Sequence, residues 1–528
     1  MQVVGPTTYV VHVQHDQLAD LSEALARASA LVDGLGSAGQ LVDVSDRPSF
    51  LVARPENDPQ PIIDRVASAP QLTFVVGAGV SMEAGLPSWP VLVRALLESA
   101  APTILNKNDR AAWLDAAAES GLLGMAATAR ALAGSDQEFV SRVERHLYRG
   151  KRPNQFDPGP LAREIAAWKG VYPDVQLATF NYDQLLERAL TDLGVACEAR
   201  EDNTAEPVGT AFVRHLHGLL TGAPVDDAVV LTEGDYARWP SGTWQDVFMR
   251  DALKGVCVFL GLSFSDQNLL RWIYGSIGTE HVAVLARQSS PRLSPEVRRE
   301  LEAAVRARLR HANVTAYWAD FYAEVAQLMH EARRRRGPGK PPRPYPVRAQ
   351  SRAMKGRRRC IPAGRLEIRQ HKVREILSAS LSGVRAALQS VDPDPADAVL
   401  GLGLWGLDYD KRDVTLLASS DRVVVDISTV TGVPLDWSSE WVAVEAITQG
   451  SVVEWDPATY ASRWHAVRGI PLVWTCPQQR ERIIVGAATL TTPEPSGNSI
   501  LDRAEQLAPG IRKTIDLALH DQLVRLWN

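Results

Sequence analysis

Short apolar runs alternate with amphipathic helical stretches through the first 330 residues, and this alternation constrains the fold more than any other feature. Parallel strands that are buried on both faces have continuous hydrophobic sequences, and helices supply the connections between them. The sequence therefore predicts an α/β domain with a Rossmann-like parallel sheet covered by helices on both faces. Strands are predicted at 71–79, 175–180, 255–263 and 281–287, and helices at 92–100, 183–194 and 268–277.

The pattern changes after residue 361. Hydrophobic and polar residues alternate in several segments as they do in antiparallel strands, and helical stretches flank them. We expect a separate α+β domain over residues 362–528. Its predicted strands lie at 396–410, 413–428, 469–476 and 482–492, and its predicted helices at 366–391, 439–450 and 500–527.

Positive charge is concentrated between these two regions. Residues 333–359 contain twelve Lys and Arg side chains and no acidic one. A segment rich in Pro, Gly and Arg buries little apolar surface, so we predict a solvated linker over 331–361. Clustered basic side chains also suit nucleic acid, because they release phosphate counterions. Tyr345 is the only aromatic residue among these basic side chains, so the segment offers little for bases to stack on. Nucleic-acid binding is therefore the less favoured interpretation.

The rest of the composition is that of a cytoplasmic globular protein. The chain has a net charge of −5, and 45% of its residues are hydrophobic. No uncharged apolar stretch approaches the ~18–20 residues that span a bilayer. The four cysteines lie far apart without a CxxC pair, which disfavours a disulfide framework and a structural zinc site. Residues 1–70 predict a small strand–helix–strand element to which we assign no chemistry.

The first chemical motif closes the strand at 71–79. Gly77-Ala78-Gly79 leads into a helical turn that contains Ser81. Glycine lets backbone N–H groups approach a pyrophosphate, and Ser81 is able to donate to a phosphate or cap the helix. Tight packing is the alternative explanation, because the full G-x-G-x-x-G spacing is absent. A G-x-x-x-x-G-K-[ST] loop is absent as well, which excludes an ordinary ATP or GTP hydrolase.

Polar groups follow the later strands in the same way. The carboxyl ends of parallel strands meet at one edge of a sheet, which is where such sheets bind ligands. Taken alone, Asn181 and Asp183 are better explained by helix capping, and most histidines are structural. A histidine with a pKa near ~6.5 nevertheless suits proton transfer at neutral pH. The residues concerned are Asn181, Asp183, His217, Gly261, Ser263 and Asn268.

Taken in order, the segments GAGVS…GLPSW, TFNYD, LHG and GLSFSDQN closely resemble the sirtuin-like (SIR2-like) domain over about residues 70–290. This version resembles the bacterial anti-phage SIR2-like NAD+ hydrolases more than the protein deacylases. Deacylases continue the first motif with Pro-Asp-Phe-Arg, whereas here Pro87 leads to Ser88-Trp89. They also commonly carry a four-cysteine zinc module, which the cysteine positions here do not allow.

The resemblance implies a role for each residue, with NAD as the substrate and no metal. Asn181 would order the attacking water beside the nicotinamide ribose. His217 would act as general base. The remaining residues would form the NAD-binding site, with Asp183 bracing its loop. The resemblance assigns the pyrophosphate to Gly77, Ala78, Gly79 and Ser81, and the adenosine ribose to Gly261, Ser263 and Asn268.

The C-terminal domain resembles a GAF domain. The resemblance rests on three segments that lie between two long predicted helices, residues 443–457, 468–473 and 484–490. Family members enclose a small ligand and frequently dimerise through their terminal helices. The resemblance therefore implies a sensor or oligomerisation module, and no residue identifies its ligand.

Together these features predict an NAD+ glycohydrolase that releases nicotinamide and ADP-ribose. We expect an abortive-infection effector that is controlled by its C-terminal domain, responds to an unknown small-molecule or phage-derived trigger and forms a homo-oligomer. An NAD-dependent protein deacylase and a non-catalytic sensor of NAD or ADP-ribose are the alternatives. The sequence leaves open whether the product is hydrolysed or cyclised.

Overall fold

The computed structural model describes residues 57–528 apart from 103–106, 222–228, 240–241, 277, 288–292, 339–344, 362–365, 393–398, 422–431, 438, 456–463 and 476–481. The strand–helix–strand element predicted for residues 1–70 lies mostly outside the described residues. Within the described part of the chain, no helix is both long and apolar enough to cross a membrane.

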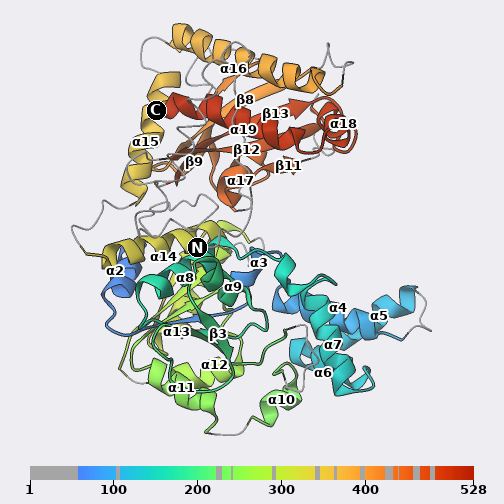
Figure 1. The fold of residues 1–528 in the computed structure, drawn as a ribbon, viewed down its shortest axis with the longest axis vertical. Coiled ribbons are helices and arrows are strands. Elements are labelled where there is room, and N and C mark those ends of the chain that lie inside the picture. Colours follow the sequence, from blue (N-terminus) through green and yellow to red (C-terminus); the bar gives the residue numbers. More distant parts are fainter. Residues whose placement is uncertain are drawn as a thin grey trace. The chain divides into compact units, whose positions relative to one another are not determined.

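A seven-stranded sheet forms the core of the first part of the described chain, in the order β3-β4-β2-β1-β5-β6-β7. Its strand β3 is labelled in Figure 1. Every pairing in the sheet is parallel. The four predicted strands are confirmed as β1, β2, β5 and β6. The strands are β1 (Leu72–Val76), β2 (Gln176–Thr179), β3 (Cys197–Arg200), β4 (Ala211–His215), β5 (Val256–Leu260), β6 (His281–Ala286) and β7 (Val314–Ala319).

Helices cover both faces of this sheet, as predicted. Successive side chains of a strand point to opposite faces, so Phe74 and Val75 enter two separate hydrophobic cores. Ile165 of α8 packs in the core of Phe74, and Phe248 of α11 packs in the core of Val75. The helices around the sheet are α2 (Gln60–Ser68), α3 (Gly79–Met82), α8 (Pro160–Val171), α9 (Leu185–Asp192), α10 (Glu233–Ala237), α11 (Trp244–Ala252), α12 (Gln267–Tyr274), α13 (Pro295–Arg310) and α14 (Tyr322–Arg336).

Helix α2 belongs to the first of these cores, through the buried side chains of Ile62 and Val66. The sequence analysis assigned these residues to the N-terminal element. Their apolar spacing of four residues instead matches one helical face that packs on the sheet domain.

A helical module lies between β1 and β2 in the chain and has a core of its own, which includes Leu96 and Phe139. Only its first helix was predicted. The last one begins at Ser135, whose hydroxyl accepts a hydrogen bond from the backbone N–H of Glu138 at 3.1 Å. The module consists of α4 (Trp89–Ala100), α5 (Lys107–Ala118), α6 (Gly121–Ala131) and α7 (Asp136–Leu147).

The second sheet is antiparallel, in the order β10-β9-β8-β13-β12-β11, and confirms the predicted α+β pattern. One prediction is wrong: the closing helix is divided in two. Pro509 lacks a backbone N–H, and Gly510 has a φ of 95°, so the chain turns between α18 and α19. The elements are β8 (Gly401–Asp408), β9 (Asp413–Ser419), β10 (Gly432–Pro434), β11 (Val453–Trp455), β12 (Ala466–Thr475), β13 (Arg482–Thr492), α16 (Leu366–Gln389), α17 (Val442–Gln449), α18 (Ile500–Leu507) and α19 (Ile511–Val524).

The prediction of a solvated linker over residues 331–361 is wrong for most of that segment. Helix α14 continues to Arg336, and a further helix, α15, spans Tyr345–Cys360. Tyr345, Ala349 and Ala353 recur every four residues along α15 and are buried, and α15 packs against β8 and β13. Composition hid this apolar stripe because two of its three members are alanines and arginines surround them.

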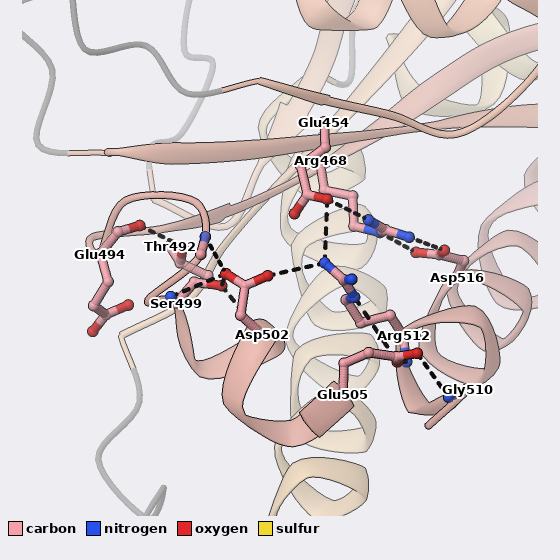
Figure 2. Close-up of polar contacts among 11 residues, drawn as sticks. Glu454, Arg468, Thr492, Glu494, Ser499, Asp502, Glu505, Gly510, Arg512 and Asp516 are labelled. Carbon is pink, nitrogen blue, oxygen red and sulfur yellow. Dashed lines mark hydrogen bonds and ion pairs between the residues drawn. The ribbon is translucent and has the colours of Figure 1, made fainter. Parts of the chain in front are cut away.

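An ion-pair network connects α18 and α19 to the second sheet (Figure 2). Arg468 of β12 donates to both carboxylate oxygens of Asp516 on α19, at 2.8 and 2.7 Å, and to Glu454 of β11 at 3.0 Å. Arg512 bonds Asp502 at 3.0 Å and Glu454 at 3.3 Å. The bidentate pair is the most buried part of the network, with side-chain exposures of 13% for Arg468 and 9% for Asp516.

We expect Arg468→Ala to lower the free energy of unfolding by about 1–3 kcal/mol, because it leaves the buried Asp516 carboxylate without its bidentate partner. Urea denaturation measured by circular dichroism tests this. Arg503→Ala is the control, since the Arg503 side chain is exposed and, in the described structure, makes only a long hydrogen bond of 3.4 Å to the Asn498 carbonyl. Equal stability losses in the two variants would contradict the prediction.

Candidate active site

Two loops pack directly against each other where β1 and β5 end. The backbone N–H of Gly77 donates to the carbonyl of Leu260 at 2.9 Å, and that of Gly79 donates to the carbonyl of Gly261 at 3.0 Å. A Cβ atom on Gly79 would lie 2.6 Å from the Gly261 Cα. Gly261 has a φ of 66°, and a Cβ there would lie 2.7 Å from the backbone nitrogen of Val80. This contact between loops is itself sufficient to require glycine at these positions.

Asn181 and Ser81 tie the end of β2 to the same loop. The Asn181 Nδ2 donates to the Gly77 carbonyl at 3.1 Å and to the Ser81 Oγ at 2.9 Å. Ser81 in turn donates to the Asp183 Oδ2 at 2.8 Å. Both amide hydrogens of Asn181 are therefore engaged, so its side chain presents an acceptor oxygen to any ligand.

Asp183 braces this loop. Its Oδ1 accepts from the backbone N–H of Leu185 at 3.1 Å, and Ser81 occupies its Oδ2. Burial raises the pKa of Asp183, and the bonds from Ser81 and Leu185 act in the opposite direction. Ser81 forms no helix cap, and α3 is a single turn of four residues.

His217 lies two residues beyond β4, next to β2 in the sheet, in an aromatic pocket. Its ring meets Phe180 edge-to-face at 4.7 Å between ring centres, and Tyr236 and Trp239 at 5.6 and 6.0 Å. Phe180, whose ring His217 contacts, directly precedes Asn181 in the chain. Asp266 lies next to the imidazole, with its Oδ2 3.6 Å from the His217 Nε2.

The pKa of His217 shifts in the opposite direction from that of His215, two residues earlier in the chain. Burial lowers the pKa of His217 below its ordinary value, and the nearby Asp266 carboxylate only partly opposes this. His217 is therefore neutral at pH 7. Burial also disfavours the charged form of His215, but Glu187 and the carbonyl of Asn181 outweigh it and raise the pKa of His215.

His215 holds the backbone of the site. Its Nδ1 lies 2.9 Å from the Asn181 carbonyl oxygen, and its Nε2 lies 2.7 Å from the Glu187 Oε1. The ring is fully buried. With both nitrogens engaged, His215 is a structural residue, whereas the Nε2 of His217 is buried without a hydrogen-bond partner among the described residues.

The loop after β5 carries the remaining predicted residues. Ser263 is exposed and its Oγ lies 2.6 Å from the Ser265 Oγ. Asn268 is buried on α12, and its Nδ2 has no hydrogen-bond partner among the described residues. Between them, Phe264 has a φ of 57°, a conformation that is strained for an aromatic residue.

Asp266 has two roles in this loop. Its Oδ1 accepts from the backbone N–H of Leu269 at 2.8 Å and so caps α12. Its Oδ2 faces His217 and accepts a hydrogen bond from the Tyr236 hydroxyl. The sequence analysis did not assign Asp266, Tyr236 or Trp239 to the site. The motif GLSFSDQN contains Asp266, so its polar loop was a usable signal, whereas nothing in the sequence distinguishes Tyr236 and Trp239.

The structure thus brings Gly77, Gly79, Ser81, Asn181, Asp183 and Gly261 into one bonded unit, with His217 alongside. Ser263 lies in the loop after β5, and Asn268 lies in the first turn of α12, which follows that loop. No cluster of three or more side chains able to hold a metal ion occurs in the described ranges.

No curated protein gives a significant match to this chain. Among solved structures, the chain is similar to a Sir2 homolog–NAD complex at 14% identity, covering 55% of this chain and 98% of that one, with a TM-score of 0.29. It is also similar to Sir2Tm bound to a propionylated peptide, at 14% identity, covering 52% and 97%, with a TM-score of 0.29. Residues 175–311, which contain Asn181, His217 and the loop after β5, match the family model of the SIR2-like domain.

Proposed function

We propose that residues 71–330 form an NAD+ glycohydrolase that releases nicotinamide and ADP-ribose. The observation that supports this most is that the Asn181 amide, fixed by Gly77 and Ser81, is accompanied by the neutral imidazole of His217, whose Nε2 has no hydrogen-bond partner among the described residues. The two follow neighbouring strands, since Thr179 of β2 pairs with His215 of β4. The SIR2-like match over 175–311 agrees with this assignment.

The proposed chemistry requires only what these side chains supply. Cleavage of the bond between ribose and nicotinamide develops positive charge on the ribose, and a water completes the reaction. The acceptor oxygen of Asn181 would orient that water, and neutral His217 would take a proton from it or from a ribose hydroxyl. The aromatic walls formed by Phe180, Tyr236 and Trp239 would limit access of bulk water. Asn268 would donate to the adenosine ribose from its Nδ2, which has no hydrogen-bond partner in the described part of the chain.

Mass spectrometry of NAD and its products with the purified full-length chain tests the proposal. Release of nicotinamide with ADP-ribose supports it, and cyclic ADP-ribose would indicate cyclisation. Release of deacylated peptide that depends on an acyl-lysine substrate would indicate a deacylase. Tight binding of NAD without turnover would indicate a sensor.

The pH dependence of the reaction should report on His217. Its pKa lies below 6.5, so the neutral base is present above that pH and is lost as the pH falls through the lowered pKa. We expect kcat/KM for NAD to decline in acidic solution, at a lower pH than an imidazole of ordinary pKa would give.

Asp266→Asn sharpens this prediction. The Asp266 carboxylate raises the pKa of His217, so its removal should move the acidic decline to still lower pH. Asparagine also caps helices, which preserves the start of α12. Asp251→Asn is the matched control, because Asp251 is exposed and pairs only with Lys254 in the described structure. A shift toward higher pH in Asp266→Asn would contradict the assignment of His217 as the base.

For the C-terminal region we propose a GAF-like sensor or oligomerisation domain that restrains a cytoplasmic abortive-infection effector. Its antiparallel sheet with helices α16 and α19 supports the proposal. Light scattering after size-exclusion chromatography, together with NAD measurements in infected and uninfected cells, tests it. A monomer whose expression leaves NAD unchanged during infection would argue against it.

A further inference from the structure

A cavity of about 850 Å³ lies between α7 and α9. None of the residues predicted for the active site lines it. Its walls come from Glu144 of α7, from Tyr148 directly after that helix, from residues 150–154 and from Glu187 of α9. Its volume falls within the ~300–1,000 Å³ of small-molecule sites.

Two carboxylates in its wall are incompletely satisfied. Glu187 is 7% exposed; His215 engages its Oε1, but its Oε2 has no hydrogen-bond partner among the described residues. The buried Oε1 of Glu144, in the same wall, also has none there. A buried carboxylate oxygen that lacks a donor is costly, and it can only accept. A ligand that completes this wall must therefore offer hydrogen-bond donors.

The rim of the cavity is basic. Arg145, Lys151 and Arg152 line it, are exposed, and form no ion pair with any described residue. Their charge disfavours a cationic ligand, so the donors for the two carboxylates must be neutral groups such as hydroxyls. The same charge attracts a phosphate.

We infer that this cavity binds a phosphorylated ribose, with its hydroxyls toward Glu144 and Glu187 and its phosphate toward Arg145 and Lys151. Such a compound combines neutral donors and an anion within one small molecule. A free sugar phosphate and a mononucleotide share this chemistry. The inference does not depend on NAD cleavage.

Calorimetric titration of the full-length chain with ribose 5-phosphate, AMP, adenosine and inorganic phosphate tests it. We expect the two ribose phosphates to bind more tightly than adenosine or phosphate alone. Glu144→Gln replaces one acceptor oxygen by a donor NH2 group. It should weaken the binding of ribose 5-phosphate and of AMP by at least ~10-fold and leave the binding of inorganic phosphate unchanged. The double variant Arg145→Gln/Lys151→Gln should weaken every phosphate-containing ligand. If AMP binds and ribose 5-phosphate does not, the base contributes and the ligand is a mononucleotide.

Arg142→Gln is the matched control, because Arg142 lies on the same helix, pairs with Glu138 and does not line the cavity. It should bind the ligands like the wild type. The inference is overturned if neither ribose phosphate binds. It is also overturned if the ribose phosphates bind equally well to Glu144→Gln and to Arg145→Gln/Lys151→Gln. The ligand would then occupy a different site, such as the proposed NAD site.

Discussion

Replacing His217 by alanine is expected to slow the release of nicotinamide from NAD by about 10²–10⁴-fold, the usual contribution of a general base. The imidazole is neutral because burial lowers its pKa, and its Nε2 has no hydrogen-bond partner among the described residues. Removing it takes away the proposed proton acceptor, and none of the bonds among Gly77, Ser81, Asn181 and Asp183 involves His217. Chromatographic assay of nicotinamide under single-turnover conditions measures the effect.

His371→Ala is the control for this loss, because the His371 side chain is 77% exposed on α16 and pairs only with Glu375 in the described structure. Its turnover should equal that of the wild type. Calorimetric titration of His217→Ala with NAD then shows whether the variant still binds NAD. Retained binding with slow turnover indicates loss of the base, and lost binding indicates damage to the binding site. If this variant retained wild-type turnover, the catalytic role of His217 would be wrong.

Replacing Arg287 by alanine is expected to destabilise the parallel-sheet domain by about 3–5 kcal/mol, as breaking a buried ion pair does. Arg287 follows β6, is 8% exposed and binds both carboxylate oxygens of Glu302. It also donates to Asp320 at the end of β7. Its removal leaves the buried Glu302 with the more distant Arg306, at 3.8 Å.

The midpoint of chemical denaturation, followed by tryptophan fluorescence, measures this loss. Arg299→Ala provides the comparison, because Arg299 lies on the same α13 segment as Glu302, is 74% exposed and pairs with Glu296 at 3.8 Å. Its effect should stay within about 0.5 kcal/mol. A loss below about 1 kcal/mol in Arg287→Ala would show that the buried pair contributes little net stability.

The sequence predicted the parts of the fold in which apolar residues form an unbroken run. Strand β5, Val-Cys-Val-Phe-Leu, is buried at every position and was predicted. The edge strand β3, Cys-Glu-Ala-Arg, is only partly buried and carries no such run, so it was missed. Helix α15 was missed for the opposite reason, since its stripe of Ala349 and Ala353 lies among arginines that dominate the composition.

The candidate site could be located from the sequence because its loops follow strands whose carboxyl ends share one edge. What each group does there could not be deduced in the same way. The glycines serve a contact between two loops, and Ser81 is engaged by Asp183 and Asn181. Tyr236 and Trp239 reach His217 only through tertiary folding.

The interlocking of Gly77 and Gly79 with Gly261 also bears on how a ligand would be received. With no room for even a methyl group between them, the two turns cannot shift separately without disturbing β1 and β5, which pair along their whole length. An incoming molecule would thus meet a preorganised surface and lose little affinity to ordering of the backbone. Adaptation to molecules of another shape must come from side chains at the periphery.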